Sequence, residues 1–321
     1  MVAPTMTDIL ITAPMPDVER GLESHFTLHR LWEASDQQAL LAAIGPRIAG
    51  LAVSSGGGRL GDALLAHLPN LQIAASFGVG YDHVDLPAIT ARKLVVTNTP
   101  GVLTEEVADL TLGLLLATLR QIPAAERFLR AGQWETRKFP LSPSLRGRRV
   151  GILGLGDIGL ATARRLEACG VEIAYHTRHP RDVPYAYFDS PVALAGAVDV
   201  LIVLVPGGAA THHLVDTAVL TALGPDGVLI NVARGAVVDT HALIEALRDG
   251  TILSAGLDVF EEEPHVPQAL LDMPHVVLLP HIGSASVVTR AAMSKLVVDN
   301  LVSWFETGTA LTPIGESRPF L

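Results

Sequence analysis

Three polar residues in the second half of the chain have side chains that could together act on a ketone. Arg234 lies in LINVARGAVVD, Glu263 in GLDVFEEEP and His281 in VVLLPHIGSAS. Each follows an apolar segment typical of a buried strand, and ligands of open α/β sheets bind at the carboxyl ends of the strands. We therefore expect the three side chains to gather at one edge of a sheet.

These residue types suit the reduction of a 2-keto acid by hydride from a nicotinamide. The guanidinium of Arg234 can hold a carboxylate with a forked pair of hydrogen bonds and polarise the ketone. His281 can protonate the ketone oxygen, since an ordinary imidazole has a pKa of about 6.5. Glu263 can orient the imidazole and favour its protonated form. Taken singly, each residue could equally be a solvated loop residue, and only the complete set favours this chemistry.

A glycine-rich turn predicts that the chain binds a dinucleotide. In VGILGLGDIG, Gly154, Gly156 and Gly159 form a G-x-G-x-x-G frame between an apolar strand and a helical pattern. The first glycine would allow a tight turn, the second a close approach to pyrophosphate, and the third close packing of helix on strand. An ordinary strand-to-helix turn is the alternative. Asp157 inside the turn would add like charge near the phosphates unless it points outward.

The end of the next predicted strand, AYHTRH, indicates which dinucleotide is bound. Thr177 lies 21 residues after Gly156, where dinucleotide-binding folds place an acid that holds the ribose hydroxyls. A threonine removes the repulsion that an acid would exert on a 2′-phosphate and can donate to that phosphate. Arg178 can add a charge-assisted contact. We therefore expect NADP(H) to be preferred, with NAD(H) possible; a solvated Arg178 is the alternative.

Apolar segments alternate with helical patterns along the chain, which predicts parallel α/β sheets. In the first lobe we expect strands at 8–14, 26–32, 48–54, 71–77 and 93–99, with helices near 60–67 and 85–92. In the second lobe we expect strands at 148–156, 171–176, 197–206, 227–233, 252–260 and 276–280. A long helix should run from Thr104 towards Arg130, and a last helix should cover about 287–307.

A lone last helix cannot form a domain, so it should dock back on the first lobe. We therefore expect two Rossmann-like or flavodoxin-like α/β domains separated by an active-site cleft. Residues 1–99 and 285–321 would form a discontinuous substrate-binding domain, and residues 100–284 the dinucleotide-binding domain.

Composition excludes several classes of protein. Among 321 residues, 49% are hydrophobic and 17% charged, and 23 Lys and Arg face 33 Asp and Glu. The net charge of −10 argues against binding to nucleic acid or to an anionic membrane. The longest apolar stretch, near 110–119, has half of the ~20 residues that a membrane span needs. With no basic segment before a long apolar run at the N-terminus, a cytoplasmic location is expected.

Cysteine and histidine patterns predict no metal site. Cys169 is the only cysteine, which excludes an internal disulfide; we expect it to be a buried structural thiol. The 12 histidines show no HExxH spacing. The neighbours His212 and His213 should face different ways and serve structural or surface roles.

Six motifs, found together in this order, give the chain a specific resemblance to a known family. They are FGVGYDHVDL, VTNTPGVLTEEVADLTLGLLLATLR, VGILGLGDIG, INVARGAVVD, AGLDVFEEEP and LLPHIGSAS. Nearly the whole chain resembles the D-isomer-specific 2-hydroxyacid dehydrogenases. THHLVD, EEEPHVP and the HTR strand end look most like the NADPH-dependent glyoxylate/hydroxypyruvate reductases, including the hydroxyphenylpyruvate reductase branch.

The resemblance implies roles for particular residues. It assigns catalysis to Arg234, Glu263 and His281, and it implies a homodimer with much of the interface in residues 101–146. Substrate would also meet backbone N–H groups of Val79 and Gly80 and of Ser55, Gly56 and Gly57. The cofactor would contact Thr104, Gly154, Gly156, Asp157, Ile158, Gly159, Thr177, Arg178, Val205, Pro206, Thr211, Val232, Ala233, Asp258, His281, Gly283 and Ser284.

Three features depart from the family pattern. The run 56–58 is unusually glycine-rich, which would loosen the substrate loop. Gly208 stands where a threonine is frequent, and Asp157 where an arginine is frequent.

The resemblance implies reduction of a small-molecule 2-keto acid. Glyoxylate and hydroxypyruvate are the expected substrates, giving glycolate and D-glycerate. A reductase for a bulkier acid, hydroxyphenylpyruvate or 2-ketogluconate, is the alternative within the class. Phosphoglycerate dehydrogenase is disfavoured because residue 177 is not an acid and no regulatory domain follows. A non-catalytic dinucleotide-sensing protein is the alternative from another class.

Overall fold

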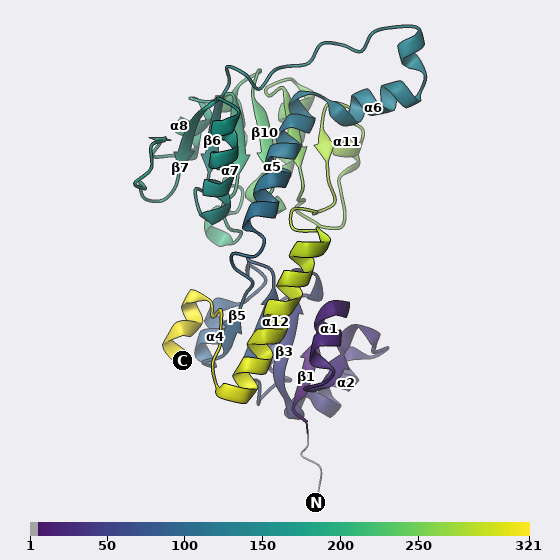
Figure 1. Cartoon of the computed structure of the whole chain (residues 1–321), viewed down its shortest axis with the longest axis vertical. Helices are drawn as coiled ribbons and strands as arrows, with labels where there is room; N and C mark the ends of the chain where they lie inside the picture. The colour runs from purple at the N-terminus through teal and green to yellow at the C-terminus, as the bar shows by residue number, and fades with distance from the viewer. Residues whose placement is uncertain (1–5) are drawn as a thin grey trace, which may run out of the picture. The chain divides into compact units, whose positions relative to one another are not determined.

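The computed structural model describes residues 6–321, and the chain divides into two compact units (Figure 1). The first unit takes the residues up to Leu103 together with Ser286–Leu321, and the second takes Thr104–Ala285. Each unit is built on a parallel sheet, which confirms the predicted fold class. The assignment of substrate to one domain, of dinucleotide to the other, and of a cleft between them stays a prediction.

The first unit has a five-stranded sheet in the order β2-β1-β3-β4-β5, with every neighbouring pair parallel. The strands are β1 (Asp8–Ile11), β2 (Thr27–Arg30), β3 (Ile48–Ser54), β4 (Ile73–Phe77) and β5 (Val95–Thr97). The direction in which strands are added reverses between β1 and β3. In open α/β sheets, ligands bind beyond the carboxyl ends of the strands at such a point.

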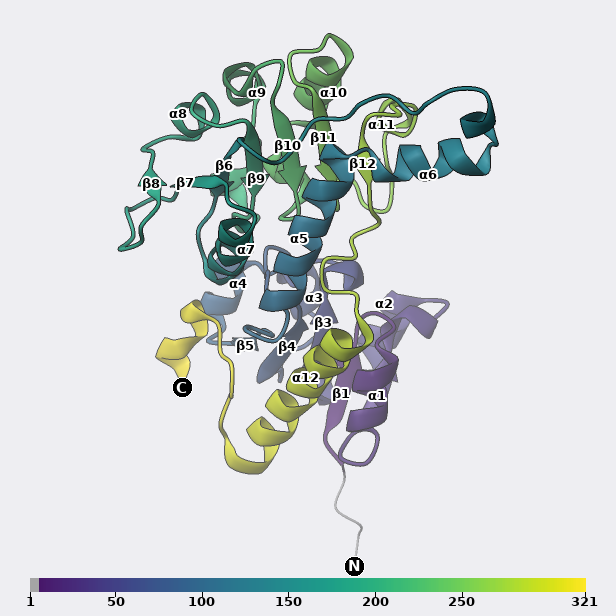
Figure 2. The same cartoon turned by 45° about the horizontal axis from the view of Figure 1, so that its top comes forward.

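Helices cover both faces of this sheet (Figures 1 and 2). They are α1 (Pro16–Leu22), α2 (Gln37–Ile44), α3 (Asp62–Leu65), α4 (Leu86–Ala91) and α12 (Val287–Thr307). Helix α12 packs on β4 and α1. It buries Met293, Val297 and Leu301, which are spaced four residues apart on one face. The side chain of Asn300, fully buried, accepts the backbone N–H groups of Leu311 and Thr312 and so ties down the C-terminal tail.

The second unit has a seven-stranded parallel sheet in the order β12-β11-β10-β9-β6-β7-β8. The strands are β6 (Arg149–Leu153), β7 (Glu172–His176), β8 (Ala186–Tyr187), β9 (Val200–Val203), β10 (Val228–Asn231), β11 (Ser254–Leu257) and β12 (Val277–Leu278). Strand β8 was not predicted, because two residues are too short for a periodic signal. The order reverses between β6 and β9. The central strands are buried on both faces, as expected for a parallel sheet covered by helices.

The helices of the second unit include a correction. They are α5 (Thr104–Leu119), α6 (Ile122–Arg130), α7 (Asp157–Ala168), α8 (Pro191–Ala195), α9 (Thr217–Leu223), α10 (Thr240–Arg248) and α11 (Gln268–Leu271). The predicted single helix from Thr104 towards Arg130 is wrong, since α5 and α6 meet at a bend of 59°. Gln121 adopts a left-handed conformation with φ 50°, and Pro123 has no N–H to continue α5.

Helix α6 and the segment after it project from the body of the second unit (Figure 2). They expose several large apolar side chains, namely Ile122, Leu129, Trp134 and Leu141. Within residues 6–321, no single helix is long and apolar enough to cross a membrane. Helices α5 and α6 reach the length and apolar composition of a membrane span only when they are taken together, and they are bent by 59° where they meet.

Cys169 is exposed, so its prediction as a buried thiol is wrong. It caps the C-terminus of α7, where the chain turns into the left-handed Gly170 with φ 69°. The buried face of α7 ends at Leu166, one turn earlier. A cysteine at this place therefore lies beyond the core.

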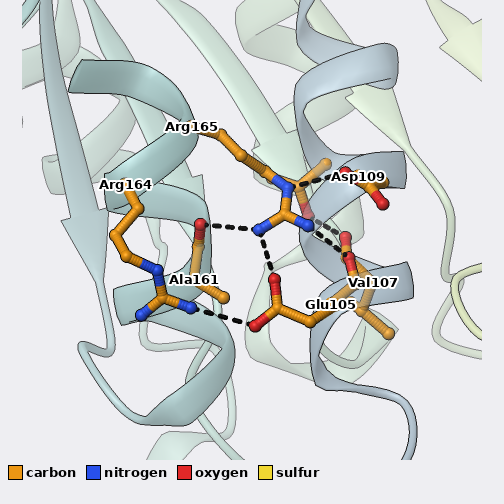
Figure 3. Close-up of polar contacts among 7 residues, drawn as sticks. Glu105, Val107, Asp109, Ala161, Arg164 and Arg165 are labelled. Carbon is orange, nitrogen blue, oxygen red and sulfur yellow. Dashed lines mark hydrogen bonds and ion pairs between the residues drawn. The ribbon is translucent and has the colours of Figure 1, made fainter. Parts of the chain in front are cut away.

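An ion-pair network joins α5 to α7 (Figure 3). Arg165 donates from Nε to Asp109 (2.6 Å), from Nη1 to the Glu105 carboxylate (2.8 Å) and from Nη2 to the Glu105 carbonyl (3.1 Å). Arg164 donates to the other oxygen of Glu105 at 2.9 Å. The hydrogen bond from Arg165 lowers the pKa of Asp109, and the same bond raises the pKa of Arg165. The network fixes α5 against α7, the helix that follows the glycine turn.

Replacing Arg165 with methionine should destabilise the second unit by about 1 kcal/mol, because the partner carboxylates are largely exposed. This corresponds to a fall in Tm of roughly 2–4 °C for a unit of this size. Thermal melts followed by circular dichroism measure it. Arg164→Met is the matched control, since Arg164 makes one exposed contact and its loss should leave Tm unchanged. An equal effect of both variants would contradict the assigned role of Arg165.

Candidate active site

His281 and Glu263 form the acid pair that the sequence predicts. The Nδ1–H of His281 donates to Glu263 Oε2 at 2.7 Å, because an ionised carboxylate can only accept. The other oxygen, Oε1, accepts the backbone N–H of Phe260 at 3.0 Å. Both carboxylate oxygens are therefore engaged. Nε2 of His281 is the ring nitrogen that can deliver a proton to a substrate.

The charge state of Glu263 suits this role. Burial works to raise its pKa, but the hydrogen bonds from His281 and Phe260 and the charges of His281 and Arg234 outweigh burial. The pKa of Glu263 therefore lies below its ordinary value of 4.5. The carboxylate stays ionised throughout the neutral range and can accept the Nδ1–H of His281.

In Glu263→Gln kcat/KM should fall at every pH, because the carboxylate that accepts the Nδ1–H of His281 and holds the ring in place is lost. The ionised Glu263 also stabilises the fold. With a lowered folded-state pKa, that contribution is complete above pH 4.5 and is lost as the pH falls through the lowered value. Glu263→Gln should therefore flatten the dependence of Tm on acid pH.

pH profiles of kcat/KM and of Tm measure both effects. Glu262→Gln, an exposed neighbour, is the control and should keep the wild-type profiles. Unchanged profiles in Glu263→Gln would contradict the pairing.

Asp258 holds the loop that carries His281. This carboxylate is 1% exposed and accepts the backbone N–H groups of Ile282 and Gly283, each at 2.8 Å. The Asp258 carbonyl accepts the N–H of His281 at 2.8 Å. Burial raises the pKa of Asp258, and the two N–H groups oppose this. The backbone of His281 is left-handed, with φ 52°. A non-glycine residue keeps this strained conformation only when surrounding contacts hold it, as the contacts of Asp258 do here. The predicted contact of Asp258 with the cofactor stays a prediction.

Arg234 is positioned by a residue that the sequence analysis missed. The buried side chain of Asn231 donates to the Arg234 carbonyl at 3.0 Å and accepts the Ala233 N–H at 3.1 Å. The sequence did offer a sign of this role: Asn231 ends an apolar strand, and a buried side-chain amide needs hydrogen-bond partners. A Cβ at Gly235 would lie 1.8 Å from the Phe260 carbonyl carbon, so the Arg234 loop packs directly on the segment leading to Glu263.

The three catalytic candidates therefore come from loops that follow the neighbouring strands β10, β11 and β12. Arg234 follows β10, Glu263 lies in the loop after β11, and His281 follows β12. The charge of Arg234 reaches Glu263, since it contributes to lowering the pKa of that carboxyl. The structure thus brings together, within the second unit, the residues that the sequence predicts to share one edge.

The glycine turn lies at the reversal point between β6 and β9. Gly154 has φ 102°, and a Cβ there would lie 2.7 Å from the Val205 backbone nitrogen. A Cβ at Gly159 would lie 2.4 Å from the Gly154 carbonyl oxygen, so α7 packs closely on the turn. Nothing lies within 4 Å of the Cβ position of Gly156, which leaves room beside the backbone. Asp157 is exposed at the first position of α7. These features fit a dinucleotide pyrophosphate at the helix N-terminus.

The strand end after β7 is ordered by contacts of its own. The hydroxyl of Thr177 donates to the His179 carbonyl at 2.6 Å, so its proton is used within the loop. Arg181 donates to the carbonyl of Leu155 in the glycine turn and links the two segments. Arg178 is exposed, and within residues 6–321 its guanidinium makes no hydrogen bond or ion pair. Its contact with a 2′-phosphate stays a prediction.

The remaining predicted cofactor contacts lie at the same edge of the second sheet or in the helices beside it. Val205, Pro206 and Thr211 follow β9, Val232 and Ala233 follow β10, Gly283 and Ser284 follow β12, Ile158 is in the first turn of α7, and Thr104 begins α5. The hydroxyl of Thr211 donates to the Pro206 carbonyl at 2.7 Å, which closes that loop.

The predicted substrate loops lie at the carboxyl ends of strands in the first unit. The loop of Val79 and Gly80 follows β4, and Asn98 donates to the Val79 carbonyl at 2.8 Å. Ser55, Gly56 and Gly57 form a short 3₁₀ turn after β3. A Cβ at Gly57 would lie 2.1 Å from Thr12 Oγ1, which follows β1, so this glycine allows close packing at the reversal point of the sheet. Whether the glycine run loosens the loop stays a prediction.

Arg290 is a second feature that the sequence analysis missed. Its guanidinium lies over the Phe77 ring, 5.4 Å from the centroid, and burial lowers its pKa. Phe77 is the last residue of β4, directly before the loop of Val79 and Gly80. A cation–π contact at this place steadies the strand end that presents the loop. The sequence did offer a sign of this contact, because Arg290 interrupts the face of α12 that is otherwise buried.

His212 and His213 do not face different ways, and that prediction is wrong. Their rings stack with centroids 3.9 Å apart and an interplanar angle of 28°. The cause is a left-handed backbone at His213, with φ 50°. Sequence spacing alone gives no sign of this conformation.

Comparisons with known proteins agree with this geometry. The family model described as "D-isomer specific 2-hydroxyacid dehydrogenase, NAD binding domain" matches residues 112–283. The chain is 45% identical to glyoxylate/hydroxypyruvate reductase A of Arabidopsis thaliana, with 95% of this chain and 98% of that protein covered. It is 44% identical to hydroxyphenylpyruvate reductase of Plectranthus scutellarioides, with the same coverage.

A solved structure is more similar still in sequence. The NADPH-dependent glyoxylate/hydroxypyruvate reductase of Sinorhizobium meliloti, in complex with NADP and malonate, is 56% identical and superposes with a TM-score of 0.93. The match covers 98% of each chain.

Proposed function

Because the chain belongs to the D-isomer-specific 2-hydroxyacid dehydrogenase family, we propose that it reduces glyoxylate and hydroxypyruvate with NADPH. The products are glycolate and D-glycerate. The observation that carries the proposal is the pair of His281 and Glu263 beside Arg234 at the edge of a dinucleotide-binding sheet. A binding protein without catalysis would not need the complete set.

The residues of this chain divide the work of the reaction. Arg234 binds the substrate carboxylate and polarises the ketone. His281 gives the proton on Nε2 to the ketone oxygen, and Glu263 stabilises the imidazolium before that transfer. A bound reduced nicotinamide supplies the hydride for the carbonyl carbon. The ketone gains one hydride and one proton, and the nicotinamide is oxidised.

The preference for NADPH is supported by the strand end after β7. Residue 177 is a threonine rather than an acid, so nothing there repels a 2′-phosphate. The exposed guanidinium of Arg178 has no other partner within the described chain. The relative from Sinorhizobium meliloti is described as NADPH-dependent and as binding NADP. NAD(H) remains usable at lower efficiency.

A homodimer is also part of the proposal. The projecting segment from α6 exposes Leu129 (56%), Trp134 (68%) and Leu141 (101%) to solvent. Apolar side chains gathered on a projecting segment favour burial against a second copy. A cytoplasmic location is proposed as well, supported by the lone, exposed cysteine.

A reductase for a bulkier acid is the second candidate. This candidate is supported by the similarity to a protein described as hydroxyphenylpyruvate reductase, which is 44% identical to the chain. The glycine-rich run 56–58 leaves the substrate loop without large side chains, which would also admit a bulkier acid.

A substrate panel tests the proposal. We would measure kcat/KM with NADPH for glyoxylate, hydroxypyruvate, 4-hydroxyphenylpyruvate and 2-ketogluconate. We expect the two small acids to exceed the bulky ones by at least about tenfold, which is about 1.4 kcal/mol of discrimination. The reverse order supports the second candidate. No turnover of any acid supports the dinucleotide-sensing alternative.

A further inference from the structure

A second cluster of ionisable side chains lies in the second unit, apart from His281 and Glu263. Ligand atoms of His212, His213 and Glu261 all lie within 4.8 Å of one another. Two imidazoles and one carboxylate are a donor set that Zn²⁺ and other first-row dications take in proteins. Neither the proposed catalysis nor the expected cofactor contacts use these three side chains.

The backbone is bent so that both imidazoles point to one side. Adjacent side chains of an extended segment normally point in opposite directions. His212 is extended, with φ −60° and ψ 124°, but His213 is left-handed with φ 50°. The N–H of His213 donates to the Ala236 carbonyl at 2.8 Å, which holds the bend. A left-handed non-glycine residue outside the catalytic set is a conformation that often marks a functional position.

His213 lies between two carboxylates. Its Nε2 is 2.8 Å from Glu261 Oε1, and its Nδ1 is 3.8 Å from Asp239 Oδ2. Burial works to raise the pKa of Glu261, but hydrogen bonds from His213 and Thr240 outweigh it and lower that pKa. Glu261 is therefore ionised at neutral pH, as a metal ligand must be.

His212 supplies the third ligand. Within residues 6–321, its ring stacks on His213 but makes no hydrogen bond or ion pair. A ring nitrogen of His212 is therefore available to an ion beside His213 and Glu261. Zinc bonds of about 2.0–2.2 Å set tetrahedral ligand atoms roughly 3.3 Å apart. The gap of 2.8 Å between His213 and Glu261 thus needs to open by only a few tenths of an ångström.

We propose that His212, His213 and Glu261 bind a transition-metal dication, with Zn²⁺ the best fit, and that Asp239 orients His213 from the other side of its ring. Water completes a four-coordinate site, as in zinc sites with three protein ligands. The ion joins the segment containing Thr211 to the turn that carries Glu263, two residues beyond Glu261. It also takes the place of the proton that links His213 to Glu261.

Titration of the full-length, metal-free protein tests the proposal. Zn²⁺ is added in a calorimeter, and Co²⁺ serves as a spectroscopic probe because its visible absorption reports tetrahedral coordination by nitrogen and oxygen. We expect one tight Zn²⁺ site per chain and a Tm that rises with Zn²⁺. Zn²⁺ should displace Co²⁺ and remove its absorption.

Two variants decide whether these residues hold the ion. His212→Ala removes an exposed ring without hydrogen bonds, so the metal-free Tm should not change. Glu261→Gln keeps the shape of the side chain. Each should weaken Zn²⁺ binding by more than about 100-fold. His241→Ala and His281→Ala are controls, and both should bind Zn²⁺ like the wild type, which separates this site from the catalytic histidine.

The proposal is overturned if His212→Ala and Glu261→Gln bind Zn²⁺ with wild-type affinity. It is also overturned if His281→Ala abolishes the binding, because the ion would then belong to the catalytic pair. The proposal is likewise overturned if the wild-type protein does not bind Zn²⁺ tightly.

Discussion

Replacing His281 with glutamine should lower kcat/KM for 2-keto acid reduction by about 100- to 10,000-fold, the usual contribution of a general acid. Glutamine keeps a hydrogen-bonding side chain of similar reach beside Glu263, but it cannot deliver a proton to the ketone oxygen. The loss should fall mainly on kcat, since the proposed binding of the substrate carboxylate by Arg234 does not depend on the imidazole. Steady-state kinetics with glyoxylate and NADPH measure the effect.

The matched control for His281 is His241→Gln, which changes an exposed histidine of α10 in the same unit. It should retain wild-type activity. The Tm of His281→Gln should stay close to that of the wild type, so that a loss of activity is not a loss of fold. Activity of His281→Gln within threefold of the wild type would contradict the role of His281.

The double variant Thr177→Asp/Arg178→Ala should reverse the cofactor preference. The change removes the guanidinium proposed to bind a 2′-phosphate and adds a carboxylate that would repel that phosphate and can hold ribose hydroxyls. A hydrogen bond to a charged group contributes about 1.5–3 kcal/mol, so the ratio of kcat/KM for NADPH to that for NADH should fall by at least about tenfold. Kinetics with both cofactors, at saturating glyoxylate, give the ratio.

Arg178→Lys is the graded control for this variant. It keeps the positive charge but loses the forked geometry, so its cofactor ratio should lie between those of the wild type and the double variant. If Arg178 is only a solvated cation, all three proteins keep one ratio. That outcome would overturn the proposed binding of a 2′-phosphate by Arg178, but it would not affect the proposed type of reaction.

The fold class could be predicted because apolar strand segments and helical patterns alternate along most of the sequence. Strand β3 (48–54) and helix α12 (287–307) begin and end where the pattern predicts. Helix α12 starts after the capping Ser286 and stops at the left-handed Gly308. The break between α5 and α6 was missed, although Pro123 is a sequence signal for it. Apolar residues continue across it, and it depends on the left-handed Gln121. Cys169 was expected to be buried because it stands just before Gly170, where a helix should end; the helix does end there, but its buried face stops at Leu166, so the thiol is exposed.

The candidate site was predictable because the complete set of residue types suits one reaction. Arg234, Glu263 and His281 stand in the loops that follow three strands, and parallel strands bring their carboxyl ends to one edge. Residues that act only by holding a loop were missed, as Asn231 shows. A cluster such as His213 with Glu261 joins positions 48 residues apart. It depends on one backbone torsion, which composition and spacing do not encode.

The most direct test of the account is kcat/KM for NADPH and for NADH, each with glyoxylate and with hydroxypyruvate. We expect turnover of both acids and a preference for NADPH of at least about tenfold, or about 1.4 kcal/mol. Preference for NADH would contradict the cofactor assignment. No turnover of either acid with either cofactor would contradict the proposed activity itself.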